Sequence, residues 1–156
     1  MGRKFLEGKR NLWNTCRKFY PLQDKKRGRS ENMDSGIILL AHGSRRETAN
    51  DVLPQLAEMV KKEAKYGRIN CAFLQFTSPD LREALKEQAE NGVKEITVVP
   101  VFLFNGIHLQ EDIPEILAEE REKYPQVEIK MAAPLGADQR IGEIIKDRIN
   151  EVREGV

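Results

Sequence analysis

Short apolar runs alternate with longer amphipathic segments from residue 36 onward. The stretch 36–41, GIILLA, is continuously apolar, which is typical of a strand buried on both faces of a sheet. Further strands are predicted over residues 69–76, 94–104 and 127–132. Helices are predicted between and after them, from about 50 to 66, 79 to 90, 111 to 124 and 137 to 153. Four successive β-α units predict an α/β domain with a four-stranded parallel sheet, right-handed crossovers and helices on both faces.

Local signals mark the ends of these elements. Thr48 or Asn50 is the expected cap of the first helix and Gly67 its end. The residues that recur at helical spacing in it are Val52, Leu56, Met59, Val60 and Glu63. Ser78-Pro79-Asp80 predicts the start of the second helix, with a capping side chain, a proline in the first helical position and an acid. Asn91-Gly92 predicts its end. Pro100 cannot donate to a sheet ladder, so regular pairing should be interrupted there.

Length and composition indicate one domain in a reducing compartment. The chain has 156 residues, a common size for a single core. Its longest near-continuous apolar stretch, 96–104, is far shorter than the ~20 residues that span a bilayer, so no membrane association is expected. Cys16 and Cys71 lie far apart without a Cys-x-x-Cys pair, which favours a cytoplasmic location over a disulfide framework.

Charge divides the chain into a basic segment and an acidic remainder. Residues 1–33 hold ten Lys or Arg against three acids, whereas residues 34–156 hold 16 against 22. Since the first segment lacks a sustained period, it is predicted to be a mostly disordered extension, with Met33 directly before the folded domain at 34–156. Contact with nucleic acid or an acidic membrane, and a targeting role, are alternatives for such a basic arm. No nucleic-acid partner is expected for the domain.

The chain has only two histidines, and each follows a predicted strand. His42 follows the first strand and His108 the third. In open parallel sheets ligands bind at the carboxyl ends of strands where the order reverses, and in a flavodoxin-like order this point lies between strands one and three. Imidazoles bind divalent transition metals and accept protons near neutral pH. Two ligands are too few for a closed structural zinc site, so a metal held briefly is predicted. A loop imidazole bonded to a nearby carbonyl is the alternative for either one.

Four stretches together resemble a known family. They are LLAHGSR, AFLQFTSPDLREAL, VVPVFLFNGIHLQEDIPEIL and APLGAD, and the resemblance covers about residues 36–152. The chain is similar to the short sirohydrochlorin chelatases, class II enzymes that insert cobalt, nickel or iron into sirohydrochlorin without ATP. The third stretch is the most specific. The resemblance implies a chelatase-like half-module of the flavodoxin-like type, a homodimer, a tetrapyrrole substrate, a divalent metal (Co²⁺ first, or Ni²⁺ or Fe²⁺) as substrate, and no permanently bound cofactor.

The resemblance also implies roles for particular residues. His42 and His108 would bind the entering metal and accept protons from the macrocycle, and Ser44 and Arg45 would lie beside the tetrapyrrole. Gln75 stands where many relatives carry a glutamate, and an amide is no base at neutral pH.

Three further charged residues have roles suggested by their chemistry. Arg46, with Arg45, could pair with the substrate's carboxylates, although a solvated loop is an equal alternative for Arg46. Glu111 or Asp112 could supply the carboxylate that Gln75 lacks. Both are also acids near a predicted helix start, where the helix dipole favours negative charge, and this is the role expected first for Asp112.

Two other functions use similar residues. A histidine phosphatase would use His42 as phosphoryl acceptor, but Ala41 stands where that superfamily has its phosphate-binding arginine. AHGSRR also lacks the glycine spacing of nucleotide-binding loops. A metal or tetrapyrrole carrier without turnover needs ligands like those of a chelatase and stays open.

Overall fold

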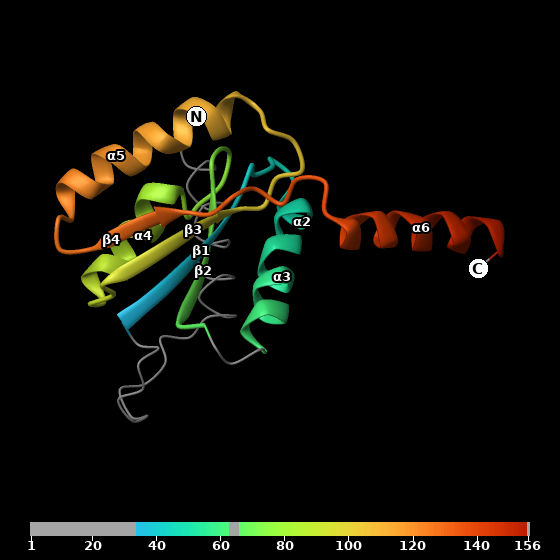
Figure 1. Ribbon diagram of the computed structural model, residues 1–156, viewed down its shortest axis with the longest axis horizontal. Helices are drawn as coiled ribbons and strands as arrows, with labels where there is room; N and C mark the ends of the chain where they lie inside the picture. The colour runs from blue at the N-terminus through green and yellow to red at the C-terminus, as the bar shows by residue number, and fades with distance from the viewer. Residues whose placement is uncertain (1–33, 63–65, 156) are drawn as a thin grey trace, which may run out of the picture.

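Four parallel strands form the centre of the computed structural model, which describes residues 34–62 and 66–155 (Figure 1). The strands are β1 (Ser35–Ala41), β2 (Arg68–Phe73), β3 (Glu95–Pro100) and β4 (Glu128–Met131). They pair in the order β2-β1-β3-β4, and every pair is parallel. The α/β class and the order assumed from the sequence are therefore confirmed. The predicted extension at 1–33 lies outside the described residues.

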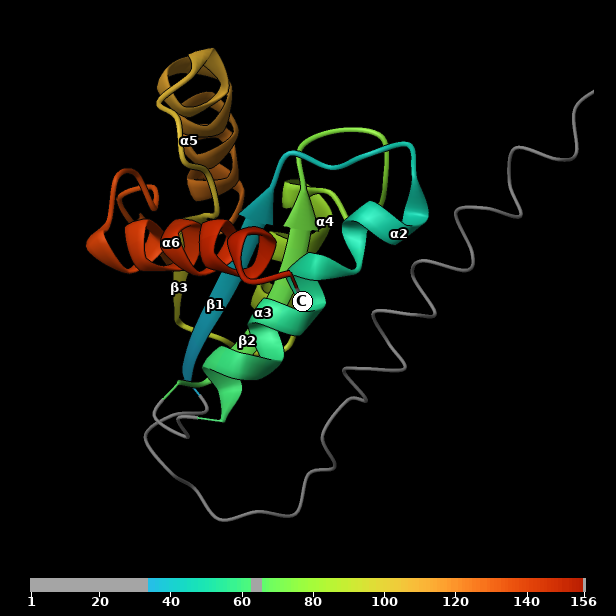
Figure 2. The same ribbon diagram turned by 90° about the vertical axis from the view of Figure 1, so that its right-hand side faces the viewer.

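Helices cover the sheet unequally on its two faces. The elements are α2 (Glu47–Asn50), α3 (Val52–Lys61), α4 (Leu81–Glu90), a π-helical turn η2 (His108–Asp112), α5 (Ile113–Lys123) and α6 (Gln139–Arg153). Figure 2 looks at the face that α3 covers, while α4 and α5 lie behind the sheet. This arrangement follows from right-handed crossovers, because the chain reverses direction across the sheet after β2. Among the described residues, no helix has the length and apolar character needed to cross a bilayer.

Alternate residues of the strands serve two separate cores. Ile38 and Leu40 of β1 pack with α4 and α5 in the larger cluster. Leu39, between them, packs with Leu53 and Ala57 of α3 in the smaller one. The fully apolar pattern of β1 is explained by burial on both faces, as expected for an interior parallel strand.

Several predicted boundaries are wrong at the level of single residues. α3 ends at Lys61, before Gly67, and neither Thr48 nor Asn50 caps a helix through its side chain. Glu63 lies outside the described residues. Asp80, rather than Ser78, caps α4.

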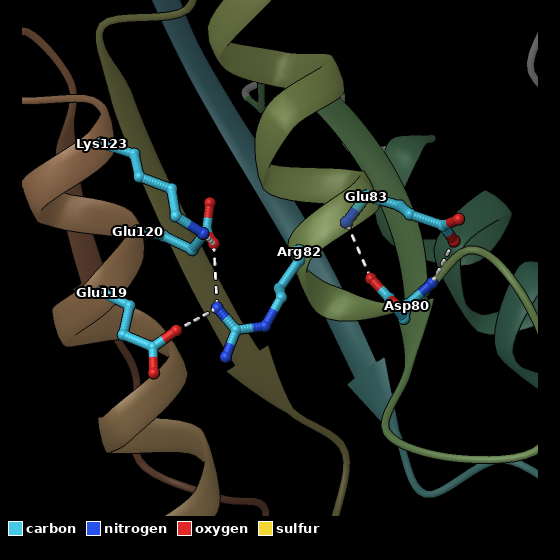
Figure 3. A network of polar contacts seen from close by, with 6 residues as sticks. All are labelled: Asp80, Arg82, Glu83, Glu119, Glu120 and Lys123. Atoms are coloured by element: carbon cyan, nitrogen blue, oxygen red, sulfur yellow. Dashed lines mark hydrogen bonds and ion pairs between the residues drawn. The ribbon is translucent and has the colours of Figure 1, made fainter.

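The α4 cap is a reciprocal pair of hydrogen bonds. The Asp80 carboxylate accepts from the backbone N–H of Glu83 at 2.8 Å, while Glu83 accepts from the backbone N–H of Asp80 (Figure 3). Such a capping box satisfies two otherwise free donors. Asn91-Gly92 ends α4 as predicted, with Gly92 at φ +81°.

The face of α3 that meets the sheet also differs from the one that the spacing suggested. Leu53 and Ala57 are buried, whereas Val52 and Met59 are 55% and 61% exposed. The first helix is thus apolar on two adjacent sides, and only one of them is covered.

A buried carboxylate joins α4 to α5. Glu120 is 2% exposed, and its Oε1 accepts from Arg82 at 3.0 Å and from Lys123 at 2.6 Å. Arg82 also pairs with the exposed Glu119 (Figure 3). Hydrogen bonding to Glu119, and then to Glu120, raises the pKa of the Arg82 guanidinium against the opposing effect of desolvation. The positive charges of Arg82 and Lys123 compensate the desolvation of the Glu120 carboxylate. The Arg82–Glu120 pair thereby holds α5 against α4 on the face of the sheet opposite to α3.

Candidate functional site

The two histidines lie side by side at the carboxyl edge of the sheet. His42 directly follows β1, and His108 opens the π-helical turn after the loop that leaves β3. Their ring centroids are 5.0 Å apart, with an angle of 76° between the ring planes. Because β1 and β3 are neighbours where the strand order reverses, their loops meet at one place. Two imidazoles separated by 66 positions along the chain are thereby brought within reach of one small ligand or ion.

Gly43 lets the loop after β1 press against the loop after β2. The backbone N–H of Gln75 donates to the carbonyl of His42 at 3.0 Å. A Cβ on Gly43 would lie 2.1 Å from the Gln75 carbonyl oxygen, and Gly43 has φ +89°. No larger residue fits without moving the backbone. The close approach of Gly43 to the Gln75 backbone therefore fixes the position of His42 at the end of β1.

Asn50 holds the rest of that loop. Its amide oxygen accepts from the backbone N–H of Ser44, and its Nδ2 donates to the Ser44 carbonyl, both at 2.9 Å. The Ser44 hydroxyl in turn accepts from the backbone N–H of Arg46 at 3.1 Å. Asn50 is 5% exposed, so this side chain stabilises the loop from below. Ser44 shapes the turn that presents the two arginines.

Arg45 lies against an aromatic ring from the neighbouring loop. Its guanidinium carbon is 4.9 Å from the centroid of the Phe76 ring. Phe76 has φ +68°, a conformation that side-chain-bearing residues seldom adopt, and is 54% exposed. The cation–π contact orients Arg45 while both groups still face solvent.

Asp112 contacts His108 directly. The two side chains meet at 2.5 Å between Nδ1 and Oδ2. The backbone between them is a π turn, in which the N–H of Ile113 donates to the carbonyl of His108. A carboxylate at Nδ1 favours the tautomer whose proton is on Nδ1, which leaves the Nε2 lone pair for a metal or a proton. Asp112 also occupies the N-cap position of α5 without a side-chain cap bond, so its expected interaction with the helix dipole stays a prediction beside this contact.

Exposed apolar side chains lie on the loops that leave the carboxyl edge of the sheet, the edge at which the two imidazoles also lie. Phe104 is the most exposed of them at 84%. They belong to the segments after β2, β3 and β4, and are Phe76, Leu103, Phe104, Ile107 and Leu135. Such a group is unusual for a solvated edge and fits the face of a flat apolar ligand.

The metal-binding capacity of this site is limited to few donors. Within 34–62 and 66–155, no three His, Cys, Asp or Glu side chains gather as a metal cage. His42 and His108 together offer two imidazole nitrogens, with Asp112 behind one of them.

The structure gathers some of the predicted site residues and leaves others aside. His42, Ser44, Arg45 and His108 share the carboxyl edge, and Gln75 contributes a backbone contact there. Arg46 and Glu111 are exposed residues of the same loops. Sequence reasoning missed Asn50 and the apolar side chains. The latter had a signal, because VFLFNGI keeps leucine, phenylalanine and isoleucine beyond the strand's end.

A parallel α/β half-module with two imidazoles in contact, and with exposed apolar side chains on the loops of the same edge, fits the class of α/β proteins that handle a metal. Comparison with known proteins identifies it further. The family model described as CbiX matches residues 36–152, and the chain belongs to this family. The family resemblance seen in the sequence is confirmed.

Relatives and solved structures agree with this assignment. The chain is 38% identical to a sirohydrochlorin cobaltochelatase of Methanopyrus kandleri, over 74% of this chain and 94% of that protein. It is 34% identical to a sirohydrochlorin ferrochelatase of Priestia megaterium, over 74% of this chain but only 43% of the other. A protein of Marinobacter aquaeolei described as a "putative cobalamin (vitamin B12) biosynthesis CbiX protein" superposes with a TM-score of 0.65 at 32% identity, covering 78% of this chain and 99% of that one. The sirohydrochlorin chelatase SirB of Bacillus subtilis subspecies spizizenii, in complex with cobalt, gives 0.72 at 26%, covering 77% and 51%.

Proposed function

We propose that this chain inserts a divalent metal into sirohydrochlorin, with His42 and His108 as the groups that receive the metal and the displaced protons. Sirohydrochlorin chelation is the activity of the family's named members, both cobaltochelatases and ferrochelatases. The observation that carries the residue assignment is the 5.0 Å approach of the two rings at the carboxyl edge.

The chemistry of insertion suits these groups. Two pyrrole N–H protons must leave the macrocycle while the hydrated cation exchanges water for ring nitrogens. A neutral imidazole accepts either a metal or a proton through its lone pair. His108 is held by Asp112 at Nδ1, so its Nε2 is the atom available for that exchange. With only two imidazoles as donors, the protein binds the ion loosely enough to release it.

The substrate's other features match the surroundings of the histidines. A tetrapyrrole has a flat apolar face, for which Phe76, Phe104 and Ile107 are the exposed contacts. Its peripheral carboxylates pair with guanidinium groups, and Arg45 is already oriented by Phe76. We assign to Arg46, on the same loop, an ion pair with a further carboxylate of the substrate. Ser44 and Gln75 would instead hold the conformation of the loops beside the substrate.

Cobalt is the first choice of metal substrate. The chain covers 94% and 92% of the cobaltochelatases of Methanopyrus kandleri and Sulfurisphaera tokodaii, whereas it covers 43% and 51% of two ferrochelatases. The matched region therefore accounts for nearly the whole of the cobalt-named relatives and for about half of the iron-named ones. Ni²⁺ and Fe²⁺ remain candidates, since imidazole binds all three. The buried thiol of Cys71 is consistent with the reducing cytoplasm that we propose as its location.

A homodimer is the assembly that we propose. The chain matches about half of SirB, and two copies supply the length of the longer relatives. The carboxyl edge of one protomer would contact only one side of a bound ligand. A second copy would contact the other side.

The experiment is an anaerobic assay of the full chain with sirohydrochlorin and each of Co²⁺, Ni²⁺ and Fe²⁺, followed by the change in the ring's absorption. Many turnovers per chain are expected, which a carrier would not give. His108→Ala and His42→Ala should lose insertion and keep the far-UV circular dichroism of the wild type. Gln110→Ala, in the same turn as His108 but exposed, is the matched control. Insertion by His108→Ala at the wild-type rate would show that the site is misassigned.

A further inference from the structure

Asn50 is a buried amide to which the proposed reaction gives no role. Within the described residues, 34–62 and 66–155, the buried polar or charged side chains are Asn50, Gln88 and Glu120. Gln88 bonds to strands β1 and β2, and Glu120 joins α4 to α5, so both hold the scaffold together. Asn50 bonds instead to the loop after β1, which carries the residues assigned to the substrate.

The Asn50 amide pairs with both backbone groups of one residue. Its Oδ1 accepts from the N–H of Ser44 and its Nδ2 donates to the carbonyl of Ser44, both at 2.9 Å. Two bonds to one peptide segment fix its orientation as well as its position, as a neighbouring strand does in a sheet. The Ser44 hydroxyl accepts from the N–H of Arg46 at 3.1 Å, which extends the constraint across Arg45.

Asn50 also connects this loop to the hydrophobic core. It is the last residue of α2, and α3 begins two residues later (Figure 2). Leu53 and Ala57 of α3 are buried against the sheet in the smaller core cluster. The position of Ser44 is therefore set by a helix whose own position is fixed by packing.

His42 is held by contacts that do not involve Asn50. Its carbonyl accepts from the backbone N–H of Gln75 at 3.0 Å, and Gly43 lies directly against the Gln75 carbonyl. Both contacts precede Ser44 in the chain. Loss of the Asn50 amide should therefore release the part of the loop that bears the arginines and leave the imidazole in place.

We propose that Asn50 is a positioning residue for the tetrapyrrole, because it holds Ser44 so that the two arginines after it are in place for the substrate's carboxylates before binding. This inference rests on the proposed function and adds to it a residue that sets the affinity for the macrocycle. Arg45 also contacts Phe76, but both side chains are exposed, so that contact alone does not fix the backbone. A loop already held in its binding conformation loses less entropy when the ligand binds.

The test is Asn50→Ala in the full chain, with three quantities measured. The apparent KM for sirohydrochlorin should rise about tenfold, the loss expected when about 1.4 kcal/mol of binding is removed. The kcat should stay within about twofold of the wild type, because the lost interaction is made equally in the ground state and the transition state. The Kd for Co²⁺ alone should not change. A wild-type KM, or a higher Kd for Co²⁺ in place of a higher KM, would overturn the inference.

Asn70→Ala is the matched control for loss of stability. Asn70 is half-buried on β2, donates to Glu87 and accepts from Gln88, both at 3.3 Å, and lies outside the site. This variant should lower the unfolding midpoint in urea and keep the wild-type KM, and an equal rise in KM would contradict the positioning role. Asn50→Asp leaves no cavity and retains the acceptor for the Ser44 N–H, but it loses the donor to the Ser44 carbonyl. It should raise the KM as well, and it replaces Asn50→Ala if that variant does not fold.

A double-mutant cycle shows whether Asn50 acts through the arginines. The Kd for sirohydrochlorin without metal is measured from the change in its absorption, with and without Asn50→Ala, in the wild type and in an Arg45→Ala, Arg46→Ala background. The tenfold effect should appear in the first and vanish in the second, since residues that act together are not additive. An equal effect in both would overturn the inference. A wild type that binds no sirohydrochlorin would refute the proposed function itself, whereas a wild type that binds and inserts metal, with Asn50→Ala its equal, would refute this inference alone.

Discussion

Replacing Asp112 by Asn tests whether His108 depends on a negative charge at its Nδ1. The Asp112 oxygen lies 2.5 Å from that nitrogen. Asparagine has the same shape and can still accept from Nδ1–H through its amide oxygen, but it carries no charge. The variant therefore removes the electrostatic part of the contact and leaves its geometry in place.

The size of the effect follows from the kind of hydrogen bond. Bonds to a charged group contribute about 1.5–3 kcal/mol and neutral ones about 0.5–1.5 kcal/mol, so the charge accounts for about 1–1.5 kcal/mol. Solvent screens part of it, because the His108 and Asp112 side chains are 31% and 51% exposed. We expect about a tenfold loss in the apparent affinity for the metal, at the lower end of the 10–100-fold range for carboxylates behind metal-binding histidines.

The assay separates positioning from general damage. The apparent KM for Co²⁺ and the Kd for Co²⁺ alone should both rise about tenfold. The KM for sirohydrochlorin and the unfolding midpoint should stay at the wild-type values. Glu111→Gln removes an equal charge from the adjacent exposed residue and is the matched control. Unchanged metal dependence in Asp112→Asn, or an equal loss in Glu111→Gln, would refute the reasoning.

Three further predictions concern the scaffold around the site. Gly43→Ala should destabilise the fold in urea by at least about 2 kcal/mol, because its Cβ meets a backbone carbonyl; Gly92→Ala, also at positive φ but with open space around it, should cost only about 1 kcal/mol. Equal costs would show that the loop contact is unimportant. Glu120→Gln should cost about 1–2 kcal/mol and the exposed Glu119→Gln less than about 0.5 kcal/mol, and a reversal of that order would contradict the role of the buried carboxylate. The cap at Asp138 should persist on acidification to pH 4, since hydrogen bonds from the side chain and the backbone N–H of Arg140 hold the pKa of its carboxyl well below the ordinary 3.8. A carboxyl whose pKa is lower in the folded state stabilises that state above its unfolded pKa of 3.8, and this stabilisation is lost as the pH falls through the folded-state pKa. A change in the ¹³Cα chemical shifts of the first turn of α6 already above pH 4 would therefore contradict the prediction.

The fold was predictable because strands buried on both faces of a sheet have continuously apolar sequences, which can be recognised in the chain. GIILLA has no polar position and is typical of an interior strand, and the β-α alternation then limits the topology to few arrangements. Boundaries were less predictable, because Ser78 and Asp80 are both good caps and only tertiary packing decides between them.

The candidate site was predictable in part. The meeting of His42 and His108 followed from the strand order, which the sequence suggested without fixing. The contact of Asp112 with His108 was missed because the helix was expected to begin only at about residue 111. The structure has helical geometry from His108 onward, and there the four-residue spacing brings the two side chains together.

The π turn at His108–Asp112 has a consequence for how this site can change in evolution. A π turn amounts to an α-helix with one inserted residue, and the insertion rotates everything before it relative to everything after. Deleting one residue, such as Gln110, would restore an ordinary helical register and leave α5 in its place, yet it would shorten the spacing of the imidazole and its carboxylate from four residues to three and shift both against the sheet. A single codon deletion could therefore change where this imidazole points while the hydrophobic core stayed intact.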